Sequence, residues 1–181
     1  ERLLRLLDHA QNIGALEQIV LLEEPFPEEV DIDVHDIPVR LAADESAHSE
    51  KDAARRIEQG YTAIALKPAG KTLTASLRTA LTAYSKGIPC FCADLTVNPV
   101  LLDWNKNVAA RLAPLPGLKI GVIESNGAQN YRNWEQMRKW HPLGNAQWTK
   151  PTAGMFVLDE SFYKTAGGIF HQSKHYAELA K

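Results

Sequence analysis

The sequence has little cysteine, and what it has does not suit a disulfide framework. Only two cysteines occur among 181 residues, Cys90 and Cys92. A Cys-x-Cys pair on one short strand points both thiols to the same face of a sheet and cannot join distant segments. We therefore expect two small buried side chains in a reducing compartment.

The sequence also lacks long apolar runs and an excess of basic charge. No run approaches the roughly 20 apolar residues of a membrane-spanning helix, and residues 1–8 form a charged amphipathic stretch rather than a signal peptide. Twenty Lys and Arg against 22 Asp and Glu give a formal charge of −2, without a basic stripe that could follow a phosphate backbone. We expect a cytoplasmic protein that binds neither membrane nor nucleic acid.

The chain does have a regular alternation of short apolar runs and amphipathic segments. After a predicted helix over residues 2–13, parallel-type strands are predicted at 18–22, 39–43, 62–66, 89–92 and 118–123. A loop is predicted at 67–71. Further helices are predicted from 49 to 60, from the end of that loop to 86, from 100 to 112 and from 130 to 140. Ser49 and Asp52 have the spacing of a helix-capping box.

Repeated β/α units predict a parallel sheet with helical crossovers. Five units do not close an eight-stranded barrel, and an open doubly wound sheet also fits the alternation. We predict an α/β fold that is part of a TIM-like (β/α) barrel, with parallel strands and outer helices, over residues 1–141. Residues 142–181 have no clear period, and we expect an irregular C-terminal tail that packs back on the barrel or on a capping domain.

Ionisable residues stand at all five predicted strand ends, which are Glu23-Glu24, Asp44-Glu45, Lys67, Asp94 and Glu124. Function collects at these ends in parallel α/β proteins. Carboxylates that meet there repel one another unless a cation lies between them, and hard oxygen ligands favour Mg²⁺ or Mn²⁺. A lysine beside that cation is expected to have a lowered pKa, as a general base near neutral pH requires. The metal would also stabilise the enediolate formed when the C–H bond next to a substrate carboxylate is broken.

Three strand ends resemble those of the enolase superfamily, particularly its muconate-lactonizing and mandelate-racemase-like branches: Leu-Leu-Glu23-Glu24-Pro25, Ala-Asp44-Glu45-Ser46 and Ala-Leu-Lys67-Pro68. The resemblance covers about residues 3–137. It implies that Glu23 and Asp44 are two of three ligands of Mg²⁺, with Mn²⁺ as the alternative. It further implies that Lys67 is the catalytic base and that Glu124 contacts the substrate.

The resemblance also gives expectations for four other residues. Glu45 resembles a carboxylate that supports the metal ligands, and we group Glu24 with it. Asp94 and Asn98 are either substrate contacts or loop caps. No histidine stands at the strand end between Cys90 and Asp94, which favours lysine chemistry over the mandelate-racemase mechanism.

The family's first metal ligand, its Lys-x-Lys pair and its capping domain are not found in these residues. The resemblance therefore implies that the chain is the C-terminal part of the barrel. The partners expected are a missing N-terminal capping domain, the first barrel strands and a small-molecule carboxylate substrate, and assembly as a homo-oligomer is left open.

We expect a Mg²⁺-dependent isomerase or lyase that removes the proton next to a carboxylate, as in a racemase, a muconate-lactonizing enzyme or an acid-sugar dehydratase. The alternative is a catalytically inactive superfamily member or a fragment that is only a structural barrel half. A phosphate-binding loop at Gly70-Lys71-Thr72 is disfavoured, because the glycine that this motif needs five residues earlier is Ala65.

Overall fold

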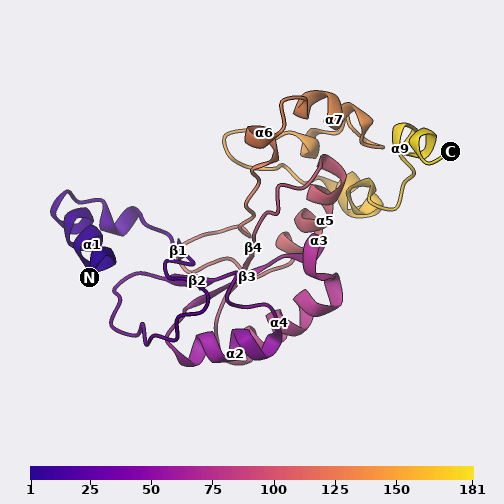
Figure 1. Cartoon of the computed structure of the whole chain (residues 1–181). Coiled ribbons are helices and arrows are strands. Elements are labelled where there is room, and N and C mark those ends of the chain that lie inside the picture. The colour runs from indigo at the N-terminus through magenta and orange to yellow at the C-terminus, as the bar shows by residue number, and fades with distance from the viewer.

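A computed structural model describes all 181 residues, Glu1 to Lys181, and contains four parallel strands that lie side by side in chain order (Figure 1). The strands are β1 (Leu22–Glu23), β2 (Leu41–Ala43), β3 (Ala63–Leu66) and β4 (Cys90–Cys92). A fifth segment runs parallel beside β4, joined to it by one bridge between Cys92 and Ile123. An order without reversal is that of a (β/α) barrel, because a doubly wound sheet reverses its order at a switch point.

Helices precede, separate and follow the strands along the chain. The first elements are α1 (Arg2–Asn12) and the 3-10 turn η1 (Leu16–Gln18). The crossovers contain α2 (Glu50–Glu58), the one-turn helix α3 (Pro68–Lys71), α4 (Leu73–Ser85) and α5 (Pro99–Ala109). The later elements are α6 (Gly127–Asn130), α7 (Trp134–Trp140), η2 (Gln147–Thr149), α8 (Glu160–Thr165), η3 (Ala166–Gly168) and α9 (Lys174–Leu179). None of the helices combines the length and the apolar content that crossing a membrane requires.

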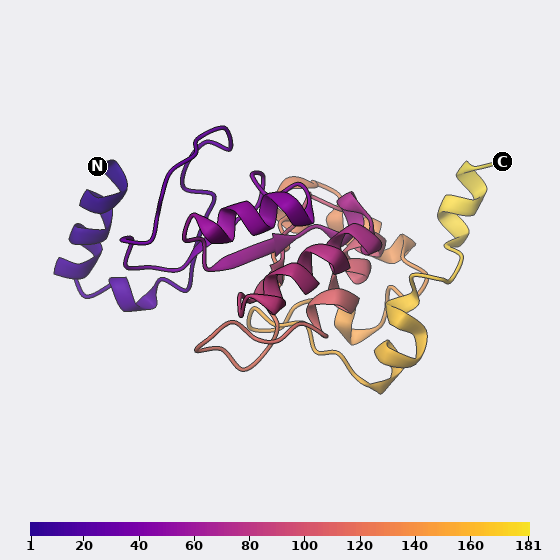
Figure 2. The ribbon, with the colours of Figure 1, turned by 90° about the horizontal axis from the view of Figure 1, so that it is seen from below.

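The two faces of the sheet are covered differently. One face packs against α2, α4 and α5 in a single core cluster, which includes Leu41, Ile64, Cys90, Ala53, Ala83 and Val108. The alternate strand residues form a second cluster to which no helix contributes: Ala42, Ala63, Ala65, Phe91 and Ala93. Figure 2 shows α2 and α4 next to one another on one side of the sheet. This one-sided covering is that of a barrel wall, so the predicted fold class is confirmed.

The second cluster defines the inner face of the sheet, and its small side chains allow the sheet to curl. Four of its five buried residues are alanine. At the start of β2, the Arg40 guanidinium donates to the carbonyl oxygens of Val20 at 2.8 Å and of Pro116 at 3.4 Å. The residues before β1 and those before the fifth segment are therefore joined by one side chain at the amino ends of the strands.

Two predicted strands differ in extent from those observed. Of residues 18–22 only Leu22 belongs to a strand, because β1 is an edge strand whose ladder with β2 is two residues long. Of residues 118–123 only Ile123 is bridged, and Ile120 is 56% exposed. An apolar run at the outer edge of the sheet has no second neighbour that could extend its ladder.

Two other local predictions need correction, and one is confirmed. The predicted loop at 67–71 is the one-turn helix α3. The predicted helix at 130–140 is interrupted at Tyr131, whose hydroxyl donates to the carbonyl oxygen of Thr96 at 2.8 Å. The capping box of α2 is confirmed, since the Ser49 hydroxyl accepts from the Asp52 amide and the Asp52 carboxylate accepts from the Ser49 amide.

Residues 142–181 pack on α5 around a buried ion cluster of Asp103, Lys106 and His141. Asp103 Oδ1 lies 2.6 Å from Lys106 Nζ, and Asp103 Oδ2 lies 2.9 Å from His141 Nε2. Nδ1 of His141 accepts from the Leu143 amide, which places the ring proton of the neutral imidazole on Nε2, the nitrogen close to Asp103. Lys106 also donates to the Trp148 carbonyl at 2.7 Å. The cluster thus joins three separate parts of the chain.

Candidate active site

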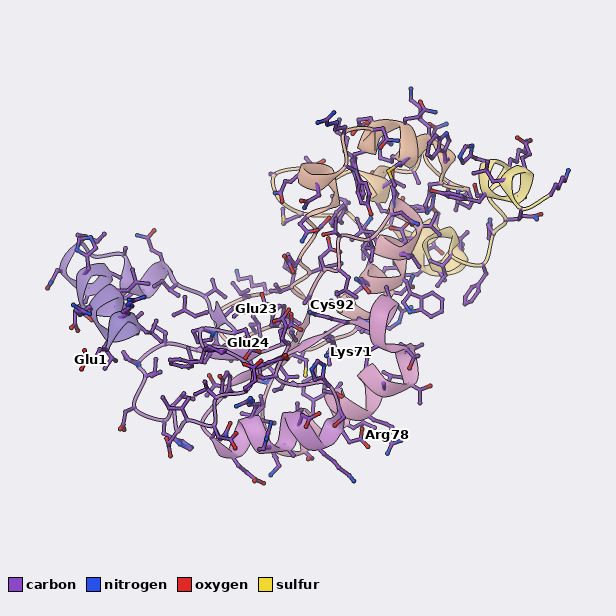
Figure 3. All side chains as sticks on the ribbon, viewed as in Figure 1. Glu1, Glu23, Glu24, Lys71, Arg78 and Cys92 are labelled. Carbon is purple, nitrogen blue, oxygen red and sulfur yellow. The ribbon has the colours of Figure 1, made fainter.

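The alternation that builds the inner face continues past the strand ends. The residues two positions beyond inner-face Leu21, Ala42, Ala65 and Val122 are Glu23, Asp44, Lys67 and Glu124. These four side chains therefore share the inner side of the sheet, and together with Glu45 we call them the strand-end cluster. Figure 3 shows Glu23 and Glu24 at the end of β1, near the middle of the molecule.

Lys67 pairs with two carboxylates of the strand-end cluster. Its Nζ is 2.6 Å from Asp44 Oδ2 and 3.1 Å from Glu45 Oε1. Lys67 and Asp44 are buried, with 7% and 3% of their surface exposed, and Glu45 is exposed. Burial lowers the pKa of Lys67, but the hydrogen bonds and charges of Asp44 and Glu45 outweigh this and leave the pKa raised. The predicted lowering of the pKa refers to a lysine beside a bound cation and stays a prediction, since the nearest charges to Lys67 in this chain are the carboxylates of Asp44 and Glu45.

Glu23 adds a second carboxyl group beside Asp44. Desolvation, the proximity of the Asp44 carboxyl group and the negative charges of Asp44, Glu124 and Glu45 raise the pKa of Glu23 to about 8. Glu23 is exposed as a residue, yet its carboxyl end lies among other carboxylates that disfavour its ionisation. Crowding of this kind is relieved when a cation joins the group.

The oxygen donors of this cluster fit a hard divalent cation. Asp44 Oδ1 is buried and has no hydrogen-bond partner, whereas Oδ2 is paired with Lys67. Carboxylate oxygens are the ligands that Mg²⁺ and Mn²⁺ prefer, and Glu23 and Asp44 would supply them. No group of three or more His, Cys, Asp or Glu side chains is placed to hold a metal ion. The chain therefore contributes a pair of candidate ligands.

Glu24 holds the backbone that carries Asp44. Its Oε2 accepts hydrogen bonds from the Asp44 amide at 2.7 Å, from the Ser46 amide at 3.1 Å and from the Ser46 hydroxyl at 3.0 Å. Glu24 has a positive φ of 39°, and its Oε1 is buried without a partner. This side chain joins the ends of β1 and β2 and fixes the position of Asp44.

Glu124 makes a corresponding contact at the other side of the cluster. Its Oε2 accepts from the Asp94 amide at 2.8 Å, and its Oε1 accepts from the Asn126 side-chain amide at 3.3 Å. The shorter bond joins the fifth segment to the end of β4. The longer bond leaves Oε1 as the less firmly held oxygen.

Asp94 and Asn98 cap backbone groups. Asp94 Oδ1 accepts from the amides of Leu95 at 2.7 Å and Val97 at 3.1 Å, and Asn98 caps α5 by accepting from the Val100 amide at 3.0 Å. Asp94 lies two residues beyond Cys92 of the helix-covered face, outside the alternation that produces the strand-end cluster. The sequence left open whether Asp94 and Asn98 are loop caps or substrate contacts. Their hydrogen bonds are those of loop caps, and a contact with substrate stays a prediction.

Lys71 and Asn105 lie next to the site, but the sequence did not predict a role for them. Lys71 Nζ donates to the Ala47 carbonyl, and Asn105 Oδ1 accepts from the Ala69 amide. One indication existed for Asn105: it is three residues from Leu102 and from Val108, on the buried stripe of α5. A polar side chain at such a position needs a partner inside the protein.

Solved structures of one enzyme family have this fold. The mandelate racemase/muconate lactonizing protein from Herpetosiphon aurantiacus aligns with a TM-score of 0.56 and 19% identity, over 68% of this chain and 34% of that one. The enzyme of the same description from Roseiflexus sp. gives a TM-score of 0.55 and 21% identity, over 70% and 36%. A putative mandelate racemase/muconate lactonizing enzyme from Sorangium cellulosum gives 0.51 and 28% identity, over 68% and 34%.

The chain thus spans about a third of the length of the structures it matches. Neither a protein-family model nor a curated protein matches its sequence. The strand order, the one-sided helices and the three structures identify the chain as a barrel segment with the fold of the mandelate racemase/muconate lactonizing enzyme family, which confirms the resemblance to the enolase superfamily.

Proposed function

We propose that Glu23, Asp44 and Lys67 form part of an active site that removes the proton next to a substrate carboxylate in a divalent-metal-dependent enzyme. The observation that carries this proposal is the buried pair of Lys67 Nζ and Asp44 Oδ2, 2.6 Å apart, with the Glu23 carboxyl group crowded against the same aspartate. A buried lysine and clustered carboxylates in one site have the chemistry for proton transfer and for cation binding.

Glu23 and Asp44 would hold Mg²⁺, with Mn²⁺ as the alternative. A bound ion would supply the positive charge that stabilises the negative charge developing on the substrate carboxylate. Lys67 would accept the proton at Nζ as the neutral amine. Asp44 and Glu45 disfavour that form in the chain alone, and a cation held by Asp44 would favour it. Glu124 positions the substrate through Oε1, the oxygen that has only the 3.3 Å bond to Asn126.

The substrate class we propose is a small-molecule carboxylate, and the reaction is that of an isomerase or a lyase. Racemisation, cycloisomerisation and dehydration of acid sugars begin with the same proton loss. The capping domain and the other barrel strands would come from a further segment or chain. For location we propose the cytoplasm, because the two cysteines are buried free thiols, as suits a reducing compartment.

Metal binding can be tested on the chain itself. Because a ligand that binds only the folded state stabilises it, MgCl₂ is expected to raise the melting temperature. Glu23→Gln and Asp44→Asn should each remove most of that increase. Glu58→Gln, on the exposed side of α2, is the matched control and should keep it. In the protein that carries this barrel half together with the other strands, a melting temperature that does not respond to Mg²⁺ or Mn²⁺ would contradict the proposed metal site and favour the structural barrel half.

Proton transfer is tested in the protein that carries this barrel half together with the other strands. Lys67→Ala is expected to stop the exchange of the substrate α-proton with solvent deuterium, followed by NMR. Arg78→Ala, which removes an exposed cation of α4, should leave the exchange rate unchanged. Full exchange in the Lys67 variant would refute the role given to this residue.

A further inference from the structure

We infer that Asn105 of α5 is a positioning residue for Lys67 and acts through the one-turn helix α3. Asn105 touches no reacting group itself. The inference deepens the proposed function, because it rests on Lys67 as the group that moves the proton. It follows from the contacts at the two ends of α3 and from the backbone that joins α3 to α4.

The first contact is at the start of α3, directly after Lys67. Asn105 is 1% exposed, and its Oδ1 accepts from the Ala69 amide at 3.1 Å. The Ala69 amide belongs to the first turn of a helix, where amides have no partner within the helix. The bond therefore connects α5 to the backbone two residues beyond Lys67 and fixes the direction in which that backbone leaves β3.

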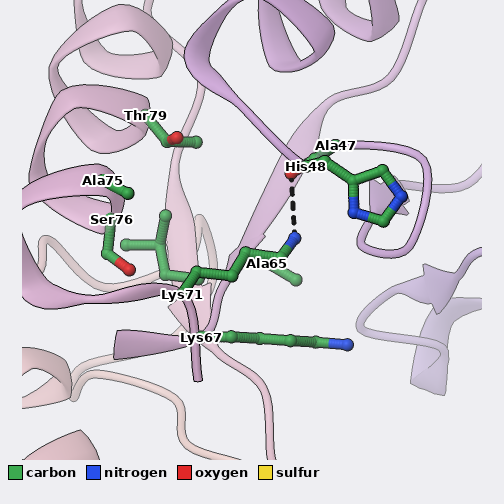
Figure 4. A pocket seen from close by; sticks show the side chains of 9 residues that line it. Ala47, His48, Ala65, Lys67, Lys71, Ala75, Ser76 and Thr79 are labelled. Atoms are coloured by element: carbon green, nitrogen blue, oxygen red, sulfur yellow. Dashed lines mark hydrogen bonds between the residues drawn. The ribbon is translucent and has the colours of Figure 1, made fainter. Parts of the chain in front are cut away.

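The second contact is at the end of α3. Lys71 Nζ donates to the Ala47 carbonyl at 3.1 Å, and the Ala47 amide donates to the Asp44 carbonyl at 3.0 Å. Figure 4 shows the Lys71 side chain reaching Ala47, with Lys67 extended in the same direction below it. The end of α3 is thus joined to the turn that carries Asp44, the residue paired with Lys67.

The space beside α3 leaves little room for displacement. The cavity lined by Lys67, Lys71 and Ser76 has a volume of about 10 Å³, which is room for no more than one water molecule. On the side of the β4 loop, a Cβ at Gly70 would lie 2.0 Å from Leu95 Cδ1. A turn this closely surrounded keeps the main chain of Lys67 in one place.

The link between α3 and α4 has an unfavourable backbone. Thr72 has φ 78° and ψ 149°, a conformation that a β-branched residue rarely adopts. A residue keeps such a conformation only where contacts with the surrounding structure outweigh its unfavourable backbone energy. The hydrogen bonds of Asn105 and Lys71 are the contacts that hold α3, directly before Thr72. We infer that without the acceptor on Asn105 the start of α3 relaxes and the Lys67 ammonium leaves Asp44 for part of the time.

The test is NMR of the full 181-residue chain labelled in its lysine side chains, with Lys67→Arg used to assign the Lys67 signals. Asn105→Ala should move the Lys67 side-chain signals toward those of exposed lysines and speed exchange of its Nζ protons several-fold. Asn105→Asp keeps an oxygen that can accept from Ala69 and should restore the wild-type signals. Asn107→Ala is the matched control, because Asn107 lies on the same helix and donates to the carbonyls of Asp103 and Ala166 instead.

Unchanged Lys67 signals in folded Asn105→Ala, or an equal change in Asn107→Ala, would overturn the inference. Amide hydrogen exchange of the wild-type chain gives a second test that needs no variant. The Ala69 amide is expected to be protected as well as the Lys71 amide, and exchange at the rate of an exposed amide would overturn the inference too. None of these measurements uses a metal or a substrate, so failure of the proposed function would not be mistaken for failure of this inference.

Discussion

Asp44 lies next to both Glu23 and Lys67 and favours opposite charge states in them, the neutral form of Glu23 and the charged form of Lys67. The carboxylate holds the Lys67 ammonium charged and hinders the ionisation of Glu23, so the pKa values of both groups are raised. For Lys67 the raised pKa favours the charged form, and for Glu23 it favours the neutral form. The cluster therefore changes its net charge mainly through Glu23 near neutral pH.

This leads to a prediction for the pH dependence of stability. The pKa of Glu23 is raised from 4.5 to about 8 in the folded chain, so the folded state binds this proton more tightly than the unfolded state. The resulting stabilisation is complete below about pH 4.5 and is lost as the pH rises through about 8. Melting curves across this range should show that Glu23→Gln removes a decrease in melting temperature with pH. An identical pH profile for the two proteins would contradict the raised pKa.

The sequence was enough to predict which residues belong to the candidate site, but it was not enough to predict which residues they contact. Glu23, Asp44 and Lys67 each follow a short apolar run, and alternation along a strand is enough to place them on one side. The partners of Asn105 and Glu24 could not be predicted, because they lie on other strands or helices. Such hydrogen bonds depend on how the strands and helices pack, and this packing cannot be predicted from a local pattern in the sequence.

Helix α2 shows a case in which local chemistry was sufficient. Its first turn is capped by Ser49 and Asp52, and the hydrogen bond from Ser49 is the main reason that the Asp52 pKa is lowered. All the residues needed for this cap are within four positions of one another. The start of α2 was therefore predictable from the sequence.

We predict that Ser49→Ala lowers the free energy of unfolding by about 1 kcal/mol, because the exposed amides at the start of α2 lose their acceptor. Urea unfolding monitored by circular dichroism would measure the change. Ser85→Ala is the control, since Ser85 donates to the Thr82 carbonyl at the end of α4 and caps no amide. If the two variants lose equal stability, the capping box has no special contribution.

The elements that differed from prediction depend on contacts with distant residues. Residues 118–123 are apolar enough for a strand, but they lie at the outer edge of the sheet and form one bridge. Helix α3 was predicted as a loop, since Pro68 and Gly70 are common in turns, and Asn105 and Ala47 stabilise it from other parts of the fold. The local pattern of apolar residues does not show whether a strand lies at the edge of a sheet or which distant residues a segment bonds to.

The buried ion cluster of Asp103, Lys106 and His141 joins the C-terminal tail to α5 of the barrel. Two of these residues lie on α5, and the third precedes the C-terminal tail. Lys106 also lies over the Phe156 ring, 3.9 Å from its centre. Burial lowers the pKa of Lys106, and the charge and the hydrogen bond of Asp103 act against this effect. Tail and barrel are therefore expected to unfold together.

Lys106→Met tests this expectation, because it keeps the length of the side chain and leaves the Asp103 carboxylate without its cation. Removing one partner of a buried ion pair costs about 3–5 kcal/mol, and urea unfolding should show a loss of this size. Lys164→Met breaks only the exposed pair with Glu160 and should cost less than about 1 kcal/mol. A loss for Lys106→Met as small as that of the control would mean that the cluster does not stabilise the tail.

The general fold was predictable only in part. Alternating strands and helices indicate a parallel sheet, but they do not distinguish a barrel from a doubly wound sheet. The difference lies in the strand order and in the packing of α2, α4 and α5 on one face. The strand order and the helix packing depend on contacts between distant segments, so neither can be predicted from one segment alone.

The parallel register of β2 has a consequence for which insertions and deletions the chain can tolerate. Ala42 pairs with Glu23 on one side and with Ala63 on the other, so the count of residues along β2 determines which side chain reaches the inner face. Deleting one residue inside this three-residue strand would turn Asp44 toward the helices and put Glu45 in its place on the inner face, with a longer side chain beside Lys67. The connection over residues 25–39 contains no helix or strand, and it could change in length without this effect. Variation in natural relatives should therefore concentrate in that connection and spare β2.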